Sequence, residues 1–211
     1  MSKILLFPAS LRRESYQRRL LEYLSTLLAG HCEIDVLNSS EVTLPLFNQD
    51  LESDPGVMSE VHSLHQRFGS ADGIIVASPE YNGHVSPYLK NTVDWVSRLG
   101  HIDARYARSN PFRDKPLLLC SATTGWSGGV IGLRDARSIF SYLGCLVAAE
   151  EIAVSRAADA ILADGYRFSP HYAEYMKEVV NNFLSLVRRF ENVQSDCPAC
   201  AAVAPKEEQA W

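Results

Sequence analysis

A short polar loop near the N-terminus collects groups that bind phosphate. Residues 10–15 are Ser-Leu-Arg-Arg-Glu-Ser, and the segment that follows has the apolar spacing of a helix. Backbone N–H groups and the dipole at a helix N-terminus attract an anion, and an arginine adds a bidentate fork. The loop has neither GxGxxG nor GxxxxGK[ST], so it is neither a Rossmann fingerprint nor a P-loop. The alternative is that Ser15 only caps the helix while the arginines are solvated.

Two further loops carry residues suited to a flat ligand. Residues 78–84 are Ser-Pro-Glu-Tyr-Asn-Gly-His, where Asn82 and Gly83 signal a turn and the tyrosine can cover an aromatic ring. Residues 121–129 are Ser-Ala-Thr-Thr-Gly-Trp-Ser-Gly-Gly, whose glycines and hydroxyls would form a shallow wall beside a planar cofactor. The alternatives are an ordinary turn with Glu80 exposed and a flexible connection.

Each of these loops follows a short apolar run that predicts a β-strand. Continuous apolar strands suit a parallel sheet covered on both faces, and their alternation with helical segments indicates an α/β, doubly wound fold. The strands are expected at 3–9, 33–37, 73–78, 115–122 and within 145–153, and the long helices at 16–29, 57–70, 87–99, 131–143 and 170–190.

Five strands match the flavodoxin-like order 2-1-3-4-5 of a doubly wound parallel sheet. Ligands of open α/β sheets bind beyond the carboxyl ends of the strands, so the three loops are expected to meet at one edge. We expect one flavodoxin-like FMN-binding domain over residues 1–190 and a mobile C-terminal tail over 191–211. The tail contains Cys197 and Cys200, a lone CxxC that is weak support for a zinc or redox site.

The composition is that of an ordinary globular protein. The 211 residues are 46% hydrophobic, and a net charge of -5 argues against a general nucleic-acid or anionic-membrane binder. No apolar run approaches the ~20 residues of a membrane span or forms the h-region of a secretory signal. We therefore expect a cytoplasmic protein. A disulfide framework is not expected, because the five cysteines are an odd number and Cys120 and Cys145 lie in apolar runs. The histidines show no metal-binding spacing.

Together these segments resemble the NADPH-dependent FMN reductases, a flavodoxin-like group of quinone, azo-dye and metal-ion reductases. That family carries an SLRxxSxN phosphate loop, an LPLYNxD segment, an SPEYNG flavin loop, an LKNAxDW helix and a later glycine pair. The similar segments here are SLRRESY at 10–16, LPLFNQD at 44–50, SPEYNG at 78–83, LKNTVDW at 89–95 and the glycines at 128–129. The resemblance covers roughly residues 3–150 and the final helix.

The resemblance implies that FMN is the cofactor and NADPH or NADH the co-substrate. The flavin would carry the chemistry, so no side chain need be an acid or base and no metal is implied. The first loop would hold the FMN phosphate, the second would line the ribityl chain and ring, and the third would border the other ring edge. In that order the implied residues are Ser10, Arg12, Ser15, Tyr16 and Gln17, then Pro79, Glu80, Tyr81, Asn82 and Gly83, and finally Ser121, Thr124, Gly125 and Gly128.

The sequence departs from the family pattern at two places. Gln17 stands where the family usually has asparagine, which weakens one phosphate contact. The connection from Leu99 to Asp114 is longer, more polar and richer in arginine than usual. It would be either a solvated loop or a lid or dimer-contact segment near the flavin.

The expected activity is electron transfer from NAD(P)H, through bound FMN, to a quinone, an azo compound, free flavin or another oxidant. The sequence identifies neither the acceptor nor the preferred nicotinamide. The expected partners are a small-molecule acceptor and further copies of the chain, as a homodimer or homotetramer by family analogy. Two alternatives are open: a flavodoxin-like electron carrier, which would bind FMN but not NAD(P)H, and a non-catalytic nucleotide-binding module.

Overall fold

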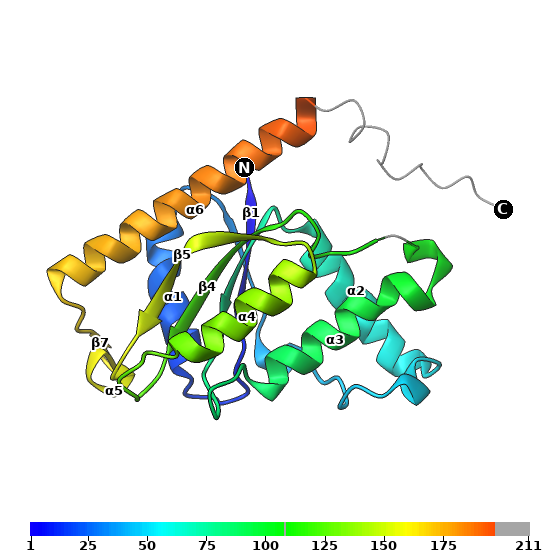
Figure 1. Ribbon diagram of the computed structural model, residues 1–211, viewed down its shortest axis with the longest axis horizontal. Coiled ribbons are helices and arrows are strands. Elements are labelled where there is room, and N and C mark those ends of the chain that lie inside the picture. Colours follow the sequence, from blue (N-terminus) through cyan, green and yellow to red (C-terminus); the bar gives the residue numbers. More distant parts are fainter. Residues whose placement is uncertain (108, 197–211) are drawn as a thin grey trace.

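The computed structural model describes residues 1–107 and 109–196, except for the side chains of 191–196. Its main sheet is parallel, with the predicted flavodoxin-like order β2-β1-β3-β4-β5 (Figure 1). Each strand lies where the apolar runs predicted it, to within one residue at either end. The strands are β1 (Lys3–Pro8), β2 (Glu33–Val36), β3 (Gly73–Ala77), β4 (Pro116–Ala122) and β5 (Leu146–Val154).

Helices cover both faces of the sheet. One face carries α1 (Tyr16–Leu28) and α6 (Pro170–Asp196), and the other carries α2 (Pro55–Ser70), α3 (Pro87–Ile102) and α4 (Val130–Tyr142). None of the described helices is both long and apolar enough to span a membrane. The sequence did not predict the smaller elements, which are η1 (Ser39–Glu41), η2 (Gln49–Leu51), η3 (Ala104–Tyr106), α5 (Ala157–Ala160) and the antiparallel pair β6 (Ile161–Leu162) and β7 (Gly165–Tyr166).

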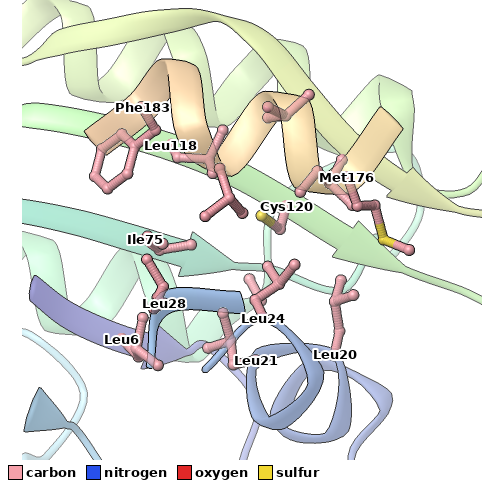
Figure 2. Close-up of a cluster of buried hydrophobic side chains, with 14 of the residues drawn as sticks. Leu6, Leu20, Leu21, Leu24, Leu28, Ile75, Leu118, Cys120, Met176 and Phe183 are labelled. Atoms are coloured by element: carbon pink, nitrogen blue, oxygen red, sulfur yellow. The ribbon is translucent and has the colours of Figure 1, made fainter. Parts of the chain in front are cut away.

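Alternate residues of the strands enter two separate cores. Figure 2 shows the first core, where Leu6, Ile75 and Leu118 of three neighbouring strands pack with the leucines of α1 and with Phe183 of α6. The residues between them, such as Ile74, pack against α2, α3 and α4 in the second core. Burial on both faces explains the continuous apolar runs. Each fully buried side chain of this size stabilises the fold by about 1.5–3 kcal/mol.

Side-chain caps decide where the helices begin. The carboxylate of Asp54 accepts hydrogen bonds from Gly56 N–H and Val57 N–H, both at 2.9 Å, so α2 begins at Pro55 rather than at the predicted residue 57. Ser86 caps α3 by accepting the N–H of Leu89 at 3.0 Å.

The last helix and the tail differ from expectation in one respect. Helix α6 continues through the expected domain boundary at residue 190 and reaches Asp196. The rest of the expected tail, with Cys197 and Cys200, lies outside the described residues.

Candidate functional site

The carboxyl ends of β1, β3 and β4 enclose a pocket of about 110 Å³. All three loops singled out in the sequence contribute to its wall, as the parallel topology requires. Its lining residues are Ser10, Arg12, Ser15, Tyr16, Gln17, Pro79, Glu80, Tyr81, Ala122, Thr123 and Thr124, of which all but Ala122 and Thr123 were predicted as cofactor contacts. The remaining predicted contacts, Asn82, Gly83, Ser121, Gly125 and Gly128, do not line this pocket.

The loop after β1 is already hydrogen-bonded without a ligand. Ser15 Oγ accepts the N–H of Gln17 at 3.2 Å, and Ser10 Oγ accepts the N–H of Arg12 at 3.4 Å. Each hydroxyl still has its own O–H to donate. Arg12 is exposed, and its guanidinium makes no ion pair within the described part of the chain. Ser15 therefore does cap α1, but its hydroxyl hydrogen and the exposed Arg12 are both available to an anion in the pocket.

Gln17 joins this loop to the end of β4. Its amide Nε2 donates to Ala122 O at 2.6 Å, and its Oε1 accepts Ala122 N–H at 3.0 Å. The residue is only 2% exposed. Gln17 thus lines the pocket, but this pair of bonds uses the carbonyl oxygen and one amide hydrogen to position two elements.

Ser86 makes a similar connection between the loops after β1 and β3. Its hydroxyl donates to Ala9 O at 2.7 Å, and Ala9 N–H in turn bonds Ala77 O at 2.8 Å. Ser86 was not predicted from the sequence as a positioning residue. The sequence did indicate its role as a helix cap, because a serine directly before Pro87 at the start of a helix is a typical N-cap.

The loop after β3 is a tight turn anchored on α4. Tyr81 and His84 exchange two backbone hydrogen bonds of 3.0 Å, and Asn82 and Gly83 both have positive φ, of 54° and 74°. Such φ values are what a two-residue type I′ turn requires, and they explain the Asn-Gly pair. The turn predicted for Asn82 and Gly83 is confirmed.

Glu80 fixes this loop to the start of the next helix. Its Oε2 accepts the N–H groups of Ile131 and Gly132, both at 3.0 Å. A carboxylate at this position satisfies two free donors of α4 and complements the helix dipole. The alternative of a solvated Glu80 is therefore wrong.

The loop after β4 is fixed at its beginning by the chain that follows β5. Thr123 O accepts Ala157 N–H at 2.8 Å, and Gly125 O accepts Arg156 N–H at 3.0 Å. Gly129 has a φ of +92°, and a Cβ there would lie 2.0 Å from Ser121 Oγ. This packing holds Ser121 fully buried beneath the loop, away from the pocket.

Thr123 lines the pocket although it was not among the predicted contacts. Its Oγ1 is buried and has no hydrogen-bond partner among the described residues, and the same is true of Ser121 Oγ. An orphaned hydroxyl costs free energy that a polar ligand would recover. Thr123 stands beside the predicted Thr124 in one Thr-Thr-Gly loop, so residue type alone does not rank one above the other.

These groups fit FMN. Arg12, the hydroxyls of Ser10 and Ser15 and the start of α1 supply the donors that a phosphate dianion needs. The pocket is far smaller than the roughly 300–1,000 Å³ of a complete ligand site, so it would hold only one end of the nucleotide. Tyr81 lines the pocket and is 44% exposed, which leaves an aromatic face for a planar ring.

The buried cysteines do not line this pocket. Burial raises the pKa of Cys145 to about 12, and it also raises the pKa of Cys120. Both thiols are free and buried, as predicted, and both stay protonated at neutral pH.

The arginine-rich connection lies at the opposite edge of the sheet. Helix α3 extends to Ile102, and the chain then packs against that helix, because a Cβ on Gly100 would lie 2.6 Å from Ser109 O. Asp114 N–H bonds Gly144 O at 2.9 Å, just before β4 begins. Arg98 pairs with Glu52 at 2.8 Å and Arg105 with Asp103 at 2.6 Å. This position does not fit the alternative of a lid near the flavin, while the solvated loop and the contact between copies of the chain stay predictions.

Comparison with known proteins agrees with this geometry. The sequence profile described as NADPH-dependent FMN reductase matches residues 2–159. A quinone reductase of Escherichia coli K12 is 30% identical over 138 residues, which are 65% of this chain and 69% of the relative. A 2-hydroxy-1,4-benzoquinone reductase of a Burkholderia species is 28% identical over 188 residues, covering 88% of this chain and 96% of the relative.

Two solved structures show the same fold. One is a flavoenzyme NAD(P)H:(acceptor) oxidoreductase from Paracoccus denitrificans, with a TM-score of 0.76 and 23% identity over 90% of this chain and 99% of its own. The other is an FMN-dependent NADH-azoreductase from Bacillus anthracis in complex with FMN, with a TM-score of 0.54 and 16% identity over 90% of this chain and 99% of its own.

Proposed function

The chain belongs to the NADPH-dependent FMN reductase family, and we propose that it oxidises NAD(P)H and reduces quinones, with azo compounds and free flavins as further acceptors. The observation that supports this most directly is the pocket at the carboxyl edge, where three loops place an arginine and several hydroxyls together. Relatives named as quinone reductases make quinones the first acceptors to test.

The protein's own residues would bind and orient rather than transfer protons. Arg12, Ser10 and Ser15 would hold the FMN phosphate, and Tyr81 and Thr124 would border the rest of the cofactor. Bound FMN supplies the capacity to take a hydride from a nicotinamide and to pass electrons to an acceptor. Glu80 would contribute by fixing the flavin loop to α4, since its carboxylate is already bonded to two backbone N–H groups.

One shared binding face implies a specific kinetic pattern. The three loops define a single pocket edge, so NAD(P)H and the acceptor would occupy it in turn. The nicotinamide would have to come within roughly 3–3.5 Å of the flavin, where an acceptor would exclude it. Initial rates with NADPH and a quinone should give parallel double-reciprocal lines. Intersecting lines, with a ternary complex trapped by a dead-end nicotinamide analogue, would show two separate sites.

Absorbance spectra separate this proposal from the two alternatives. Purified protein with FMN should show a yellow flavin spectrum, and anaerobic NADPH or NADH should bleach it. A yellow protein that neither nicotinamide bleaches would be an electron carrier. A protein that binds no flavin would be the non-catalytic module.

We further assign the protein to the cytoplasm and to a homodimer or homotetramer. Three buried, free cysteines suit a reducing compartment. Leu46, Trp126 and Tyr142 are 80%, 85% and 91% exposed, and exposed side chains of this kind suit contacts between copies of the chain. Fractionation of cells and sedimentation of the full chain at several concentrations test the two assignments.

A further inference from the structure

A histidine and a carboxylate face each other at the turn after β3. Nδ1 of His84 lies 3.3 Å from Oδ2 of Asp135, which belongs to α4. The two side chains are 72% and 35% exposed, so a ligand in solution can reach the imidazole. The segment that resembles the flavin loop of the family ends at Gly83, and the resemblance therefore assigns no role to His84.

The turn places His84 beside a side chain of the pocket wall. Tyr81 lines the pocket at the carboxyl edge, and it exchanges two backbone hydrogen bonds of 3.0 Å with His84. Residues directly opposite each other in an antiparallel pair project from the same face, with Cβ atoms roughly 4.5–5.5 Å apart. The imidazole of His84 therefore stands beside the ring of Tyr81, which under the proposed function borders the cofactor.

The pair of His84 and Asp135 is not needed to hold the turn. Glu80 already ties the turn to α4 through two backbone N–H groups at 3.0 Å, and exposed ion pairs contribute little to stability. His62 and Asp103 form a comparable pair at 3.1 Å, but the His62 side chain is only 26% exposed and its ring stacks on Tyr106. The pair at His84 differs from it in being open to solvent beside the pocket wall.

The contact with Asp135 decides what the second ring nitrogen of His84 can do. An ionised carboxylate only accepts hydrogen bonds, so Nδ1 carries the hydrogen in this pair. In the neutral ring Nε2 is then an acceptor, whereas in the charged ring Nε2 is a donor. His84 can therefore donate a hydrogen bond to a negatively charged oxygen only while the imidazole is protonated.

We propose that His84, oriented by Asp135, stabilises the negative oxygen that forms when a quinone is reduced at this site. Reduction of a quinone to a hydroquinone takes two electrons and two protons. A hydride supplied through the bound cofactor brings both electrons and one proton, so the product first carries one negative charge, and water supplies the second proton. A positively charged donor placed where that charge develops lowers the barrier. The inference rests on the proposed function and adds a catalytic residue that keeps its own proton.

The groups around His84 give the reaction a direction with pH. Asp135 is the acidic group in contact with His84 among the described residues. The other ionisable side chains on the turn and on α4 are Glu80, Tyr81, Arg134, Arg137 and Tyr142. Glu80 is bonded to the backbone of α4, and Arg137 reaches Ala148 O on β5 at 2.8 Å. The rate with a quinone should therefore fall between about pH 5 and 8, where histidines ordinarily lose their proton, and His84→Gln should remove most of this fall.

Binding of a phenol to the oxidised, FMN-loaded protein tests the inference without turnover. Ionised 4-nitrophenol resembles the hydroquinone monoanion, and its ionised and neutral forms have different absorption spectra. In absorbance titrations at several pH values, His84→Gln should weaken binding of the ionised form by about 10- to 150-fold, as expected for a charge-assisted hydrogen bond. Nitrobenzene, which has no hydroxyl to ionise, should bind the wild type and the variant within about twofold. Equal binding of ionised 4-nitrophenol to both proteins would overturn the inference.

Anaerobic half-reactions separate His84 from the rest of the site. Reoxidation of the reduced protein by a quinone should slow by about 10- to 150-fold in His84→Gln. Reoxidation by ferricyanide, which takes single electrons and no proton, should stay within about twofold, as should bleaching by NADPH and the affinity for FMN. His31→Gln, which replaces an exposed histidine just before β2 at the opposite edge of the sheet, is the matched control and should change nothing.

A double variant tests whether Asp135 acts through His84. Asp135→Ala should lower the quinone rate by a smaller factor than His84→Gln, and the double variant should be no slower than His84→Gln alone. An unchanged quinone rate in His84→Gln, or an equal loss with ferricyanide, would overturn the inference. A wild-type protein that neither NADPH nor NADH bleaches would instead contradict the proposed function.

Discussion

The loops after β1 and β4 face the same pocket, but their hydroxyls differ in what they already bind. In the loop after β1, Ser10 and Ser15 each accept a backbone N–H, and Ser15 caps α1. In the loop after β4, the hydroxyl of Thr123 is buried and has no partner among the described residues. The first loop is therefore held by its own side chains, whereas the second is held by backbone bonds from the chain after β5.

This difference distinguishes hydroxyls that position a loop from a hydroxyl that is free to bind the ligand. Hydrogen bonds made before the ligand arrives stabilise the free protein and lower the cost of ordering the site. A buried hydroxyl without a partner destabilises the free protein and gains only when a ligand satisfies it. We therefore expect substitutions of Ser10 and Ser15 to affect both folding and phosphate binding, and those at Thr123 to affect mainly the complex.

The largest effect should come from filling the space above Ser121. In Gly129→Ala, the new Cβ would lie 2.0 Å from Ser121 Oγ at a φ of +92°, so the loop after β4 must move. The free energy of unfolding in urea should fall by about 2–5 kcal/mol, and FMN binding should be lost. The matched control is Gly125→Ala in the same loop, where φ is not positive and the nearest atom is 3.7 Å away. Equal effects at the two glycines would contradict the packing argument.

The next largest effect should come from the free arginine of the first loop. Arg12→Ala should weaken FMN binding by roughly 10- to 150-fold, because a hydrogen bond to a charged group contributes about 1.5–3 kcal/mol. Riboflavin, which lacks the phosphate, should bind almost unchanged, and the stability of the free protein should stay within about 0.5 kcal/mol. Arg13→Ala is the control, since Arg13 does not line the pocket. Equal losses of affinity for FMN and riboflavin would show that the phosphate binds elsewhere.

Substitutions of Glu80 test whether this residue positions the turn after β3 or binds the cofactor. Glu80→Ala leaves the N–H groups of Ile131 and Gly132 without their acceptor and removes a negative charge from the start of α4. We expect the free protein to lose about 1–2 kcal/mol of stability. Glu80→Gln keeps an acceptor and should lose less. An alanine variant with unchanged thermal stability but weaker FMN binding would assign Glu80 to the cofactor instead.

The smallest effects should differ in sign between the two loops. Ser15→Ala removes an N-cap and should cost the free protein about 1 kcal/mol. Thr123→Val keeps the shape and removes an unpaired hydroxyl, so the free protein should be unchanged or up to about 1 kcal/mol more stable. The rise in Tm on adding FMN should be smaller in the valine variant than in the wild type. A valine variant that loses stability without ligand would show that the hydroxyl has a partner after all.

The sequence alone determined the framework and most of the pocket wall. Apolar periodicity located the five strands and the long helices, because both faces of the sheet are buried and each helix buries one face. Parallel strands place their carboxyl ends at one edge, so the loops containing Ser10, Tyr81 and Thr124 had to meet there. Residue types at local caps and turns were equally informative, as the positive φ of Asn82 and Gly83 shows.

Only the tertiary structure decided how those loops are joined. Gln17 bonds a backbone 105 residues away, and Glu80 bonds one 51 residues away. Apolar periodicity does not encode such long-range pairs. A glutamine or glutamate can satisfy its hydrogen bonds with water instead, so its residue type does not reveal a distant backbone partner. For the same reason, the sequence did not reveal the left-handed backbone of Arg156. That conformation depends on a hydrogen bond from Arg156 N–H to Gly125 O, between segments that become neighbours only when the sheet has assembled.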